Sequence, residues 1–216
     1  MSKEAQLRQV LDCGIVAVVR SQDSRQLVDV VRALAEGGVT VAEITMTVPG
    51  ALDIIRQVRQ ALGDQVLLGA GTILDPESAR AALFAGAEYI VSPTVNLDVI
   101  KLCQRYDKLV MPGAFTPTEI LTAWEAGADI VKVFPADVVG PAFFKALRGP
   151  LPQIRLMPTG GVDLNTAAAF LKAGACCLGV GGQLVEPEAV AQRDFARIRE
   201  LAKQYVAIVK QVRAKS

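Results

Sequence analysis

The sequence predicts an α/β protein whose chain, residues 1–216, forms a single-domain (β/α)8 barrel of the TIM-barrel type. Eight short apolar runs rich in β-branched residues alternate with longer stretches of helical periodicity. The length of 216 residues suits one such barrel, and no linker or change in composition divides the chain. A doubly wound open sheet is the alternative arrangement of the same elements.

The predicted strands are the apolar runs themselves. They cover Ile15–Val19, Val39–Thr45, Val66–Ala70, Tyr89–Val91, Leu109–Met111, Ile130–Phe134, Ile154–Pro158 and Cys176–Val180. The nearly continuous apolar character of I-V-A-V-V and D-I-V-K-V-F is typical of parallel strands covered by helices on both faces.

Helices are predicted between the strands. They include Asp23–Glu36, Pro49–Leu62, Pro76–Phe84, Thr118–Glu125 and Asp163–Lys172. Asp75-Pro76, Thr116-Pro117 and Asp163 supply capping side chains at helix starts, two of them followed by a proline suited to the first turn. A helical extension is expected before the first strand, and residues 187–216 are expected to form a closing helix with a basic end.

A weak internal repeat supports the alternation of helices and strands. A glycine stands just before a strand at Gly38, Gly86, Gly127 and Gly174, at intervals of 48, 41 and 47 residues. A glycine there can adopt a positive φ and end the helix that leads into the strand.

The composition excludes several classes of chemistry. With no histidine, the chain cannot contain a Ser-His-Asp triad, a Cys-His pair or a histidine-ligated metal. The net charge of +1 gives no indication of a nucleic-acid partner.

The four cysteines, Cys13, Cys103, Cys176 and Cys177, are expected to be reduced core residues. No apolar run is long enough for a signal peptide or a membrane helix, so we expect a soluble, cytoplasmic protein with no membrane partner.

Lys132 interrupts an apolar strand, and strand alternation separates its face from that of Val131 and Val133. At an ordinary pKa, only about one lysine in 2,500 is uncharged at pH 7, whereas burial lowers the pKa and frees the amine. Such an amine forms a Schiff base with a ketone. The alternative is a lysine in a structural ion pair.

Polar residues also mark the first three strands. Glu43 lies within the second, where its carboxylate can shuttle protons or form a simple salt bridge. Arg20 ends the first strand and could hold a carboxylate or phosphate. Thr72 follows Gly69 and Gly71, which either admit a ligand close to the backbone or form a plain tight turn.

The last two strands run into glycine-rich loops, at Gly160-Gly161 and at Gly181-Gly182. Barrels frequently bind phosphate at these two loops through backbone N–H groups. Both pairs therefore are candidates for a phosphate site.

These residues resemble the class I aldolases that cleave 2-dehydro-3-deoxy-6-phosphogluconate (KDPG) and 4-hydroxy-2-oxoglutarate (KHG). The resemblance covers about residues 14–185. Its most specific motifs are G-G-V-T-V-A-E-I-T at 37–45, G-A-G-T at 69–72, V-S-P at 91–93, M-P-G at 111–113, V-K-V-F-P-A at 131–136 and P-T-G-G-V at 158–162. The family implies a homotrimeric barrel that needs no metal or cofactor and acts on a small 2-oxo acid.

The resemblance also implies roles for individual residues. Lys132 would be the Schiff-base lysine and Glu43 the general acid/base. Substrate would be bound by Arg20, Thr47, Thr72, Pro93, Phe134 and Thr159, and phosphate by Gly160, Gly161, Gly181 and Gly182. Two positions depart from the family: Thr47 replaces an arginine of some members, and Gly182 replaces a frequent phosphate-binding serine.

The expected reaction is release of pyruvate from a substrate held as an iminium on Lys132. Three alternatives remain at this stage. The same enamine chemistry without an aldehyde would make a decarboxylase of oxaloacetate. A phosphosugar epimerase would usually need metal-ligating histidines, which the chain lacks. A non-catalytic barrel would leave Lys132 with its ordinary pKa.

Overall fold

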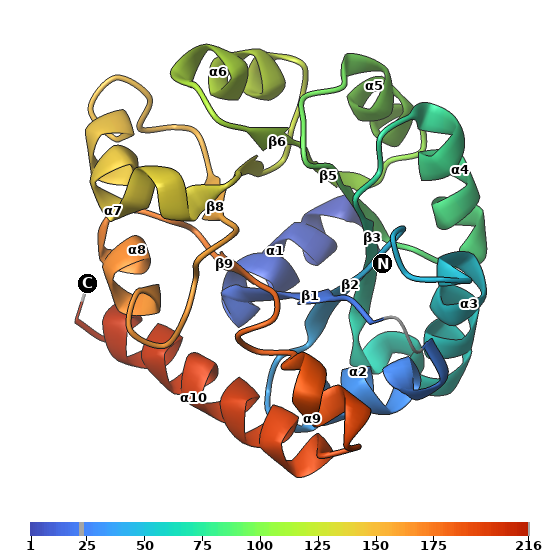
Figure 1. Cartoon of the computed structure of the whole chain (residues 1–216). Coiled ribbons are helices and arrows are strands. Elements are labelled where there is room, and N and C mark those ends of the chain that lie inside the picture. The colour runs from blue at the N-terminus through green and yellow to red at the C-terminus, as the bar shows by residue number, and fades with distance from the viewer. Residues whose placement is uncertain (22–23, 216) are drawn as a thin grey trace.

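The computed structural model describes residues 1–21 and 24–215, and shows parallel strands around the centre of the molecule with helices outside them (Figure 1). The strands are β1 (Ile15–Val19), β2 (Val41–Thr45), β3 (Leu67–Gly71), β4 (Tyr89–Val91), β5 (Leu109–Met111), β6 (Gly113–Ala114), β7 (Val131–Val133), β8 (Leu156–Pro158) and β9 (Leu178–Val180). Each of the eight predicted strands overlaps one of these.

The strands form two parallel sheets. One has the order β5-β4-β3-β2-β1-β9 and the other the order β6-β7-β8. Pro112 separates β5 from β6 in the chain and has no N–H to donate to a sheet, although its carbonyl accepts a hydrogen bond from Lys132 N at 2.9 Å. An isolated parallel bridge, Thr159↔Gly179, joins the strand ends of β8 and β9. The predicted parallel α/β architecture is confirmed.

The helices alternate with the strands. They are α1 (Lys3–Cys13), α2 (Leu27–Glu36), α3 (Ala51–Leu62), α4 (Pro76–Ala85), α5 (Leu97–Arg105), α6 (Pro117–Glu125), α7 (Ala136–Leu147), α8 (Ala167–Lys172), α9 (Pro187–Ala191) and α10 (Phe195–Arg213). Short 3₁₀ turns cover Ser24–Gln26 and Gly63–Gln65.

Most predicted helix boundaries are confirmed within a few residues. Asp75 caps α4 by accepting from Ser78 N at 2.6 Å, and Thr116 caps α6 in a reciprocal capping box with Glu119. The predicted start at Asp163 is wrong, because its carboxylate accepts from the N–H groups of Asn165 and Thr166 in a turn, and α8 begins only at Ala167.

The expected closing helix is divided into α9 and α10, and Ser216 lies outside the described residues. The predicted start at Asp23 also lies outside them. The repeated glycines behave as predicted, with φ of +94°, +114°, +99° and +101° at Gly38, Gly86, Gly127 and Gly174.

The apolar side chains form two clusters, one on each side of the strands. The larger, outer cluster packs the strands against the helices and includes Val131 and Val133. The smaller, inner cluster includes Val16, Tyr89 and Ile130. Helix α1 covers the amino ends of the strands, where Val10 belongs to the inner cluster.

Polar contacts fix α1 in this position. Lys3 pairs with Asp129 at 3.0 Å, and Gln6 donates to Glu88 at 2.6 Å.

Across the described residues, we find no helix long and apolar enough to cross a membrane. All four cysteines are free. Cys103 and Cys177 are buried, as predicted, whereas Cys13 and Cys176 are only half-buried.

Candidate active site

Lys132 lies at the middle of β7 with a side chain that is only 3% exposed. Its neighbours Val131 and Val133 point into the outer cluster, so strand alternation turns Lys132 toward the opposite, inner face. The ammonium nitrogen Nζ lies 4.9 Å from the ring centroid of Phe134, which makes a cation–π contact when the amine is charged. Lys132 therefore faces inward, and its predicted separation from the face of Val131 and Val133 is confirmed.

Glu43 lies on β2 and is 1% exposed. Ala42 and Ile44 belong to the outer cluster, which places Glu43 on the same inner face as Lys132. Its side chain lies against Gly71 of β3, where a Cβ would overlap Oε1. The other carboxylate oxygen, Oε2, has no hydrogen-bond partner among the described residues.

Burial shifts the pKa of both groups toward the neutral form. It raises the pKa of Glu43, against the opposing effects of the positive charges of Lys132 and Arg20. It also lowers the pKa of Lys132; the Glu43 charge opposes this change and the Arg20 charge adds to it. The site thus contains an amine available as a nucleophile and a carboxyl group that can gain or lose a proton.

A cavity of about 340 Å³ opens at the carboxyl ends of β1, β7, β8 and β9. Its lining includes Arg20, Phe134, Thr159, Gly160, Gly161, Gly181 and Gly182. A cavity of this size suits a small molecule. Gly160 and Gly161 have φ of +92° and +67°, a backbone conformation that other residues rarely adopt. Seven residues predicted from the sequence are therefore brought together in one place.

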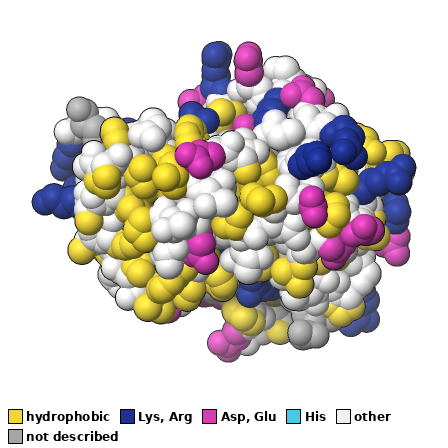
Figure 2. All heavy atoms as spheres, turned by 90° about the horizontal axis from the view of Figure 1, so that it is seen from above, with side chains coloured by type: hydrophobic (Ala, Val, Ile, Leu, Met, Phe, Trp, Pro, Cys, Tyr) yellow, Lys and Arg dark blue, Asp and Glu magenta, His cyan; other side chains and the backbone are white. Residues whose placement is uncertain are grey.

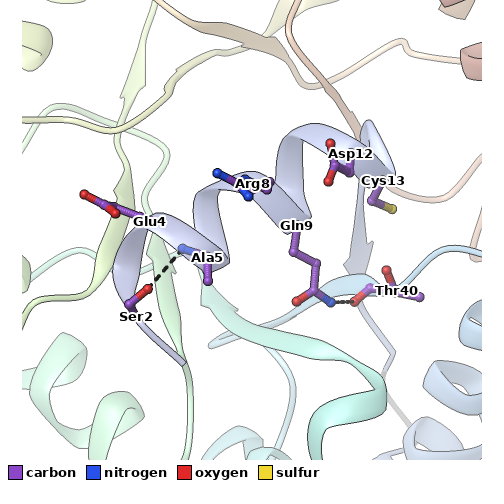
Figure 3. A pocket seen from close by; sticks show the side chains of 8 residues that line it. All are labelled: Ser2, Glu4, Ala5, Arg8, Gln9, Asp12, Cys13 and Thr40. Atoms are coloured by element: carbon purple, nitrogen blue, oxygen red, sulfur yellow. Dashed lines mark hydrogen bonds between the residues drawn. The ribbon is translucent and has the colours of Figure 1, made fainter.

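A larger hollow of about 490 Å³ lies beside α1, at the opposite ends of the strands (Figure 3). Figure 3 shows Ser2 accepting from Ala5 N and Gln9 donating to the Thr40 carbonyl across it. None of the predicted catalytic or binding residues lines this hollow. The smaller cavity, which reaches Phe134 beside Lys132, is the better candidate for the active site.

The comparisons with known proteins agree with this geometry. The family model for KDPG and KHG aldolase matches residues 6–201. The chain is 36% identical over 196 residues to the 2-dehydro-3-deoxy-phosphogluconate aldolase of Treponema pallidum, which covers 90% of this chain and 93% of that one.

The chain belongs to the KDPG and KHG aldolase family.

Two solved structures of related enzymes support the assignment. A native KDPGal structure superposes with a TM-score of 0.85 at 32% identity, over 92% of this chain and 95% of that one. The second is the KDPG aldolase of Legionella pneumophila, with pyruvate captured as a covalent carbinolamine intermediate. It superposes with a TM-score of 0.85 at 26% identity, over 92% of this chain and 96% of that one.

The lining of the cavity does not include the predicted catalytic residues Lys132 and Glu43. It also does not include three residues predicted to bind substrate, which are Thr47, Thr72 and Pro93. Thr47 is exposed, and its Oγ1 lies 2.8 Å from Oγ1 of Thr45. Thr72 follows β3 with a φ of +58°, and Pro93 follows β4 close to Gly113. All three lie at the carboxyl ends of neighbouring strands.

In the part of the chain that the structure describes, no group of three or more cysteine or acidic side chains could hold a metal ion.

Sequence reasoning missed several residues of the site. Val18, Val162, Gln183, Val185 and Pro187 also line the cavity. Tyr89 lies on the inner face near Glu43. Strand alternation places Tyr89 and Val91 on one face, but only the packing shows that this face is the one that carries Glu43.

Proposed function

We propose that the protein is a class I aldolase, a carbon–carbon lyase that cleaves KDPG to pyruvate and glyceraldehyde 3-phosphate, or KHG to pyruvate and glyoxylate. The observation that carries the proposal is the pairing of a buried lysine, whose pKa burial lowers, with a buried carboxyl group on the same inner face. Membership of the KDPG and KHG aldolase family and the captured carbinolamine of the Legionella relative support it.

The reaction begins when the free amine of Lys132 attacks the C2 carbonyl carbon of the substrate. Loss of water from the carbinolamine leaves an iminium, which acts as an electron sink. The Glu43 carboxylate accepts the proton of the C4 hydroxyl group, and the electrons of the C3–C4 bond move to the iminium. The products of this step are an aldehyde and an enamine on Lys132.

The second half of the reaction returns the enzyme to its starting state. The protonated Glu43 gives its proton to C3 of the enamine, which becomes the imine of pyruvate. Water then hydrolyses the imine and frees both pyruvate and the amine of Lys132. The raised pKa of Glu43 suits this exchange, because the group must carry the proton between the two steps.

The binding roles proposed for the remaining residues are those that the family resemblance implies. In this proposal, Thr72, Pro93, Phe134 and Thr159 surround the pyruvate portion, and Thr47 lies near the entrance. Arg20 and the backbone N–H groups of the glycine pairs bind the phosphate of the longer substrate. The names of the Treponema relative and of the 2-dehydro-3-deoxy-6-phosphogalactonate aldolase of Escherichia coli, 33% identical over 88% of this chain and 94% of that one, favour a phosphorylated substrate.

We also propose that both sheets belong to one (β/α)8 barrel domain spanning the chain, with α1 as an extension and α10 as the closing helix. The Thr159↔Gly179 bridge supports closure on one side, and the short break at Pro112 supports continuity of β5 with β6 on the other.

A homotrimer in the cytoplasm is the proposed working form. One chain of a protein cage, designed by fusing symmetric oligomeric domains, superposes on this chain with a TM-score of 0.86 at 30% identity. The match covers 94% of this chain and 74% of that one. Phe84 and Val138 are 69% and 68% exposed. Figure 2 shows apolar side chains gathered toward one side of the face seen from above. Native mass spectrometry would give the number of subunits.

The decisive experiment is reduction with borohydride in the presence of pyruvate. We expect a covalent adduct on the peptide that contains Lys132, and loss of both adduct and cleavage activity in Lys132→Ala. The variant Lys101→Ala, which changes an exposed lysine on α5, serves as the matched control. An unmodified Lys132 peptide together with a fully active Lys132→Ala would refute the proposal. Assaying oxaloacetate on the same preparation distinguishes an aldolase from a decarboxylase.

A further inference from the structure

The phenol group of Tyr89 is buried within the inner cluster, on the strand after next from Glu43. The side chain, on β4, is fully buried, and its hydroxyl group has no hydrogen-bond partner among the described residues. Buried polar atoms in folded proteins nearly always have a partner, either a protein group or an ordered water molecule. The hydroxyl of Tyr89 therefore calls for an explanation.

Gly69 on β3 stands between Tyr89 and Glu43. It is the register partner of Glu43 on one side and of Tyr89 on the other. A Cβ on Gly69 would overlap the ring of Tyr89, so the ring extends across β3 toward β2. The side chain of Glu43 lies over Gly71, two residues further along the same strand. Two glycines of β3 thus leave the space in which the phenol and the carboxylate approach each other.

The polar atoms on both sides of this space are unsatisfied. Glu43 Oε2 and the Tyr89 hydroxyl are both buried and both lack a partner. The negative charge of Glu43 contributes to the raised pKa of Tyr89, after the larger effect of burial, so the two groups are close enough to interact electrostatically. Both side chains lie on the inner face of the strands, on either side of Gly69 of β3. Buried polar atoms without a protein partner are the usual setting for an enclosed water molecule.

We propose that Tyr89 is a positioning residue for Glu43, its hydroxyl group donating a hydrogen bond to one enclosed water molecule that in turn donates to Oε2 of the carboxylate. The inference rests on the proposed role of Glu43 as the acid/base of the reaction. In this arrangement the water and the phenol hold the carboxylate in one orientation and stabilise its charged form.

Other charged and titratable groups also face this pair. Lys132 on β7 and Arg20 after β1 act on Glu43. Cys13 of α1 and Cys177 just before β9 act on Tyr89. None of these groups is altered by replacing the tyrosine with phenylalanine. The Tyr89→Phe change therefore removes one hydroxyl group and keeps the ring that fills the space over Gly69.

The test compares Tyr89→Phe with Tyr205→Phe. Tyr205 on α10 is the matched control, since its hydroxyl is likewise buried without a partner but its ring packs in the outer cluster. We expect Tyr89→Phe to lower kcat about tenfold with KM little changed, and to move the acidic limb of the kcat–pH profile to higher pH. Tyr205→Phe should leave both unchanged.

A second measurement does not depend on turnover. The Glu43 carboxyl signal, assigned by its absence in Glu43→Gln, is titrated by ¹³C NMR in the unliganded protein. We expect its pKa to rise in Tyr89→Phe and not in Tyr205→Phe. An unchanged pKa together with an unchanged kcat–pH profile in Tyr89→Phe would overturn the inference.

A crystal structure of the unliganded wild-type protein keeps the inference falsifiable if Tyr89→Phe does not fold. A water molecule within hydrogen-bonding distance of both Tyr89 Oη and Glu43 Oε2 supports it, and an empty space there overturns it. Failure of the proposed function is seen separately, because it would leave the wild-type Lys132 peptide unmodified by pyruvate and borohydride, whatever the behaviour of the Tyr89 variant.

Discussion

Lys132 and Glu43 belong to different sheets, β7 of the three-stranded sheet and β2 of the six-stranded one, yet each shifts the pKa of the other. Burial favours the neutral form of both groups, and the opposite charge of the partner offsets part of that effect. A charge lost at one of them therefore changes the protonation of the other, which couples the proposed nucleophile to the proposed proton carrier.

Replacing Lys132 with methionine should abolish cleavage while preserving the fold. Methionine keeps an unbranched chain in the buried position but has no amine, so kcat should fall by about 10³-fold or more, because the covalent pathway is lost. Removing a buried cation costs no stability once its partner is neutral, and thermal unfolding should occur at the same temperature or above. Pyruvate release and circular dichroism measure the two effects. A variant with near wild-type kcat would contradict the assignment.

Glu43→Gln should change the pH dependence of stability in a defined direction. The pKa of Glu43 is raised in the folded state, so its contribution to stability is fully present below the unfolded pKa of about 4.3 and is lost as pH rises through the folded pKa. Wild type should therefore lose stability relative to Glu43→Gln over this range, by about 1.4 kcal/mol for each unit of pKa difference. Urea unfolding at a series of pH values measures the difference. Parallel curves for the two proteins would argue against a raised pKa.

Arg20→Gln should weaken binding of the phosphorylated substrate more than that of the shorter one. Arg20 is exposed and lines the cavity. Its loss should remove the anion contact proposed for its guanidinium, raise KM for KDPG about tenfold or more and leave the fold intact. The charge of Arg20 also lowers the pKa of Lys132, so the acidic limb of the activity profile should move to higher pH. Arg56→Gln, on the exposed face of α3, is the control. Equal effects on both substrates would place Arg20 away from the phosphate.

Gly182→Ser should improve binding of the phosphate. A Cβ at Gly182 would meet nothing within 4 Å, so a serine fits without strain and adds a hydroxyl donor to the loop after β9. One added hydrogen bond corresponds to a decrease in KM for KDPG of about three- to tenfold, with KM for KHG unchanged. Gly182→Ala, which adds the Cβ without the hydroxyl, separates the hydrogen bond from packing. The same KM for both variants would show that the hydroxyl does not reach the phosphate.

The sequence was sufficient to predict the strands and the inward orientation of Lys132 and Glu43, because both leave a local signal. A single lysine or glutamate within an apolar strand stands out, and alternation assigns its face. The division of β5 from β6 at Pro112 and the kink of α7 at Gly140, with its φ of +64°, were not predicted, although both residues are visible in the sequence.

The contacts between distant segments could not be derived from the sequence in this way. Tyr89 looks like an ordinary core residue until the register of β4 against β3 places its ring over Gly69. Likewise, the glycine pairs after β8 and β9 are weak signals alone, and only the fold brings them to one cavity with Arg20. Such relations depend on pairings between residues that are far apart in the chain.

Helix α1 determines the route by which the proposed products depart. Because α1 covers the amino ends of the strands, we expect substrate and products to reach and leave Lys132 through the carboxyl ends of the strands. In the proposed reaction the pyruvate fragment stays covalently attached to Lys132 after the C3–C4 bond has broken. The aldehyde would therefore leave first through the carboxyl end, and pyruvate would follow only after hydrolysis of the imine.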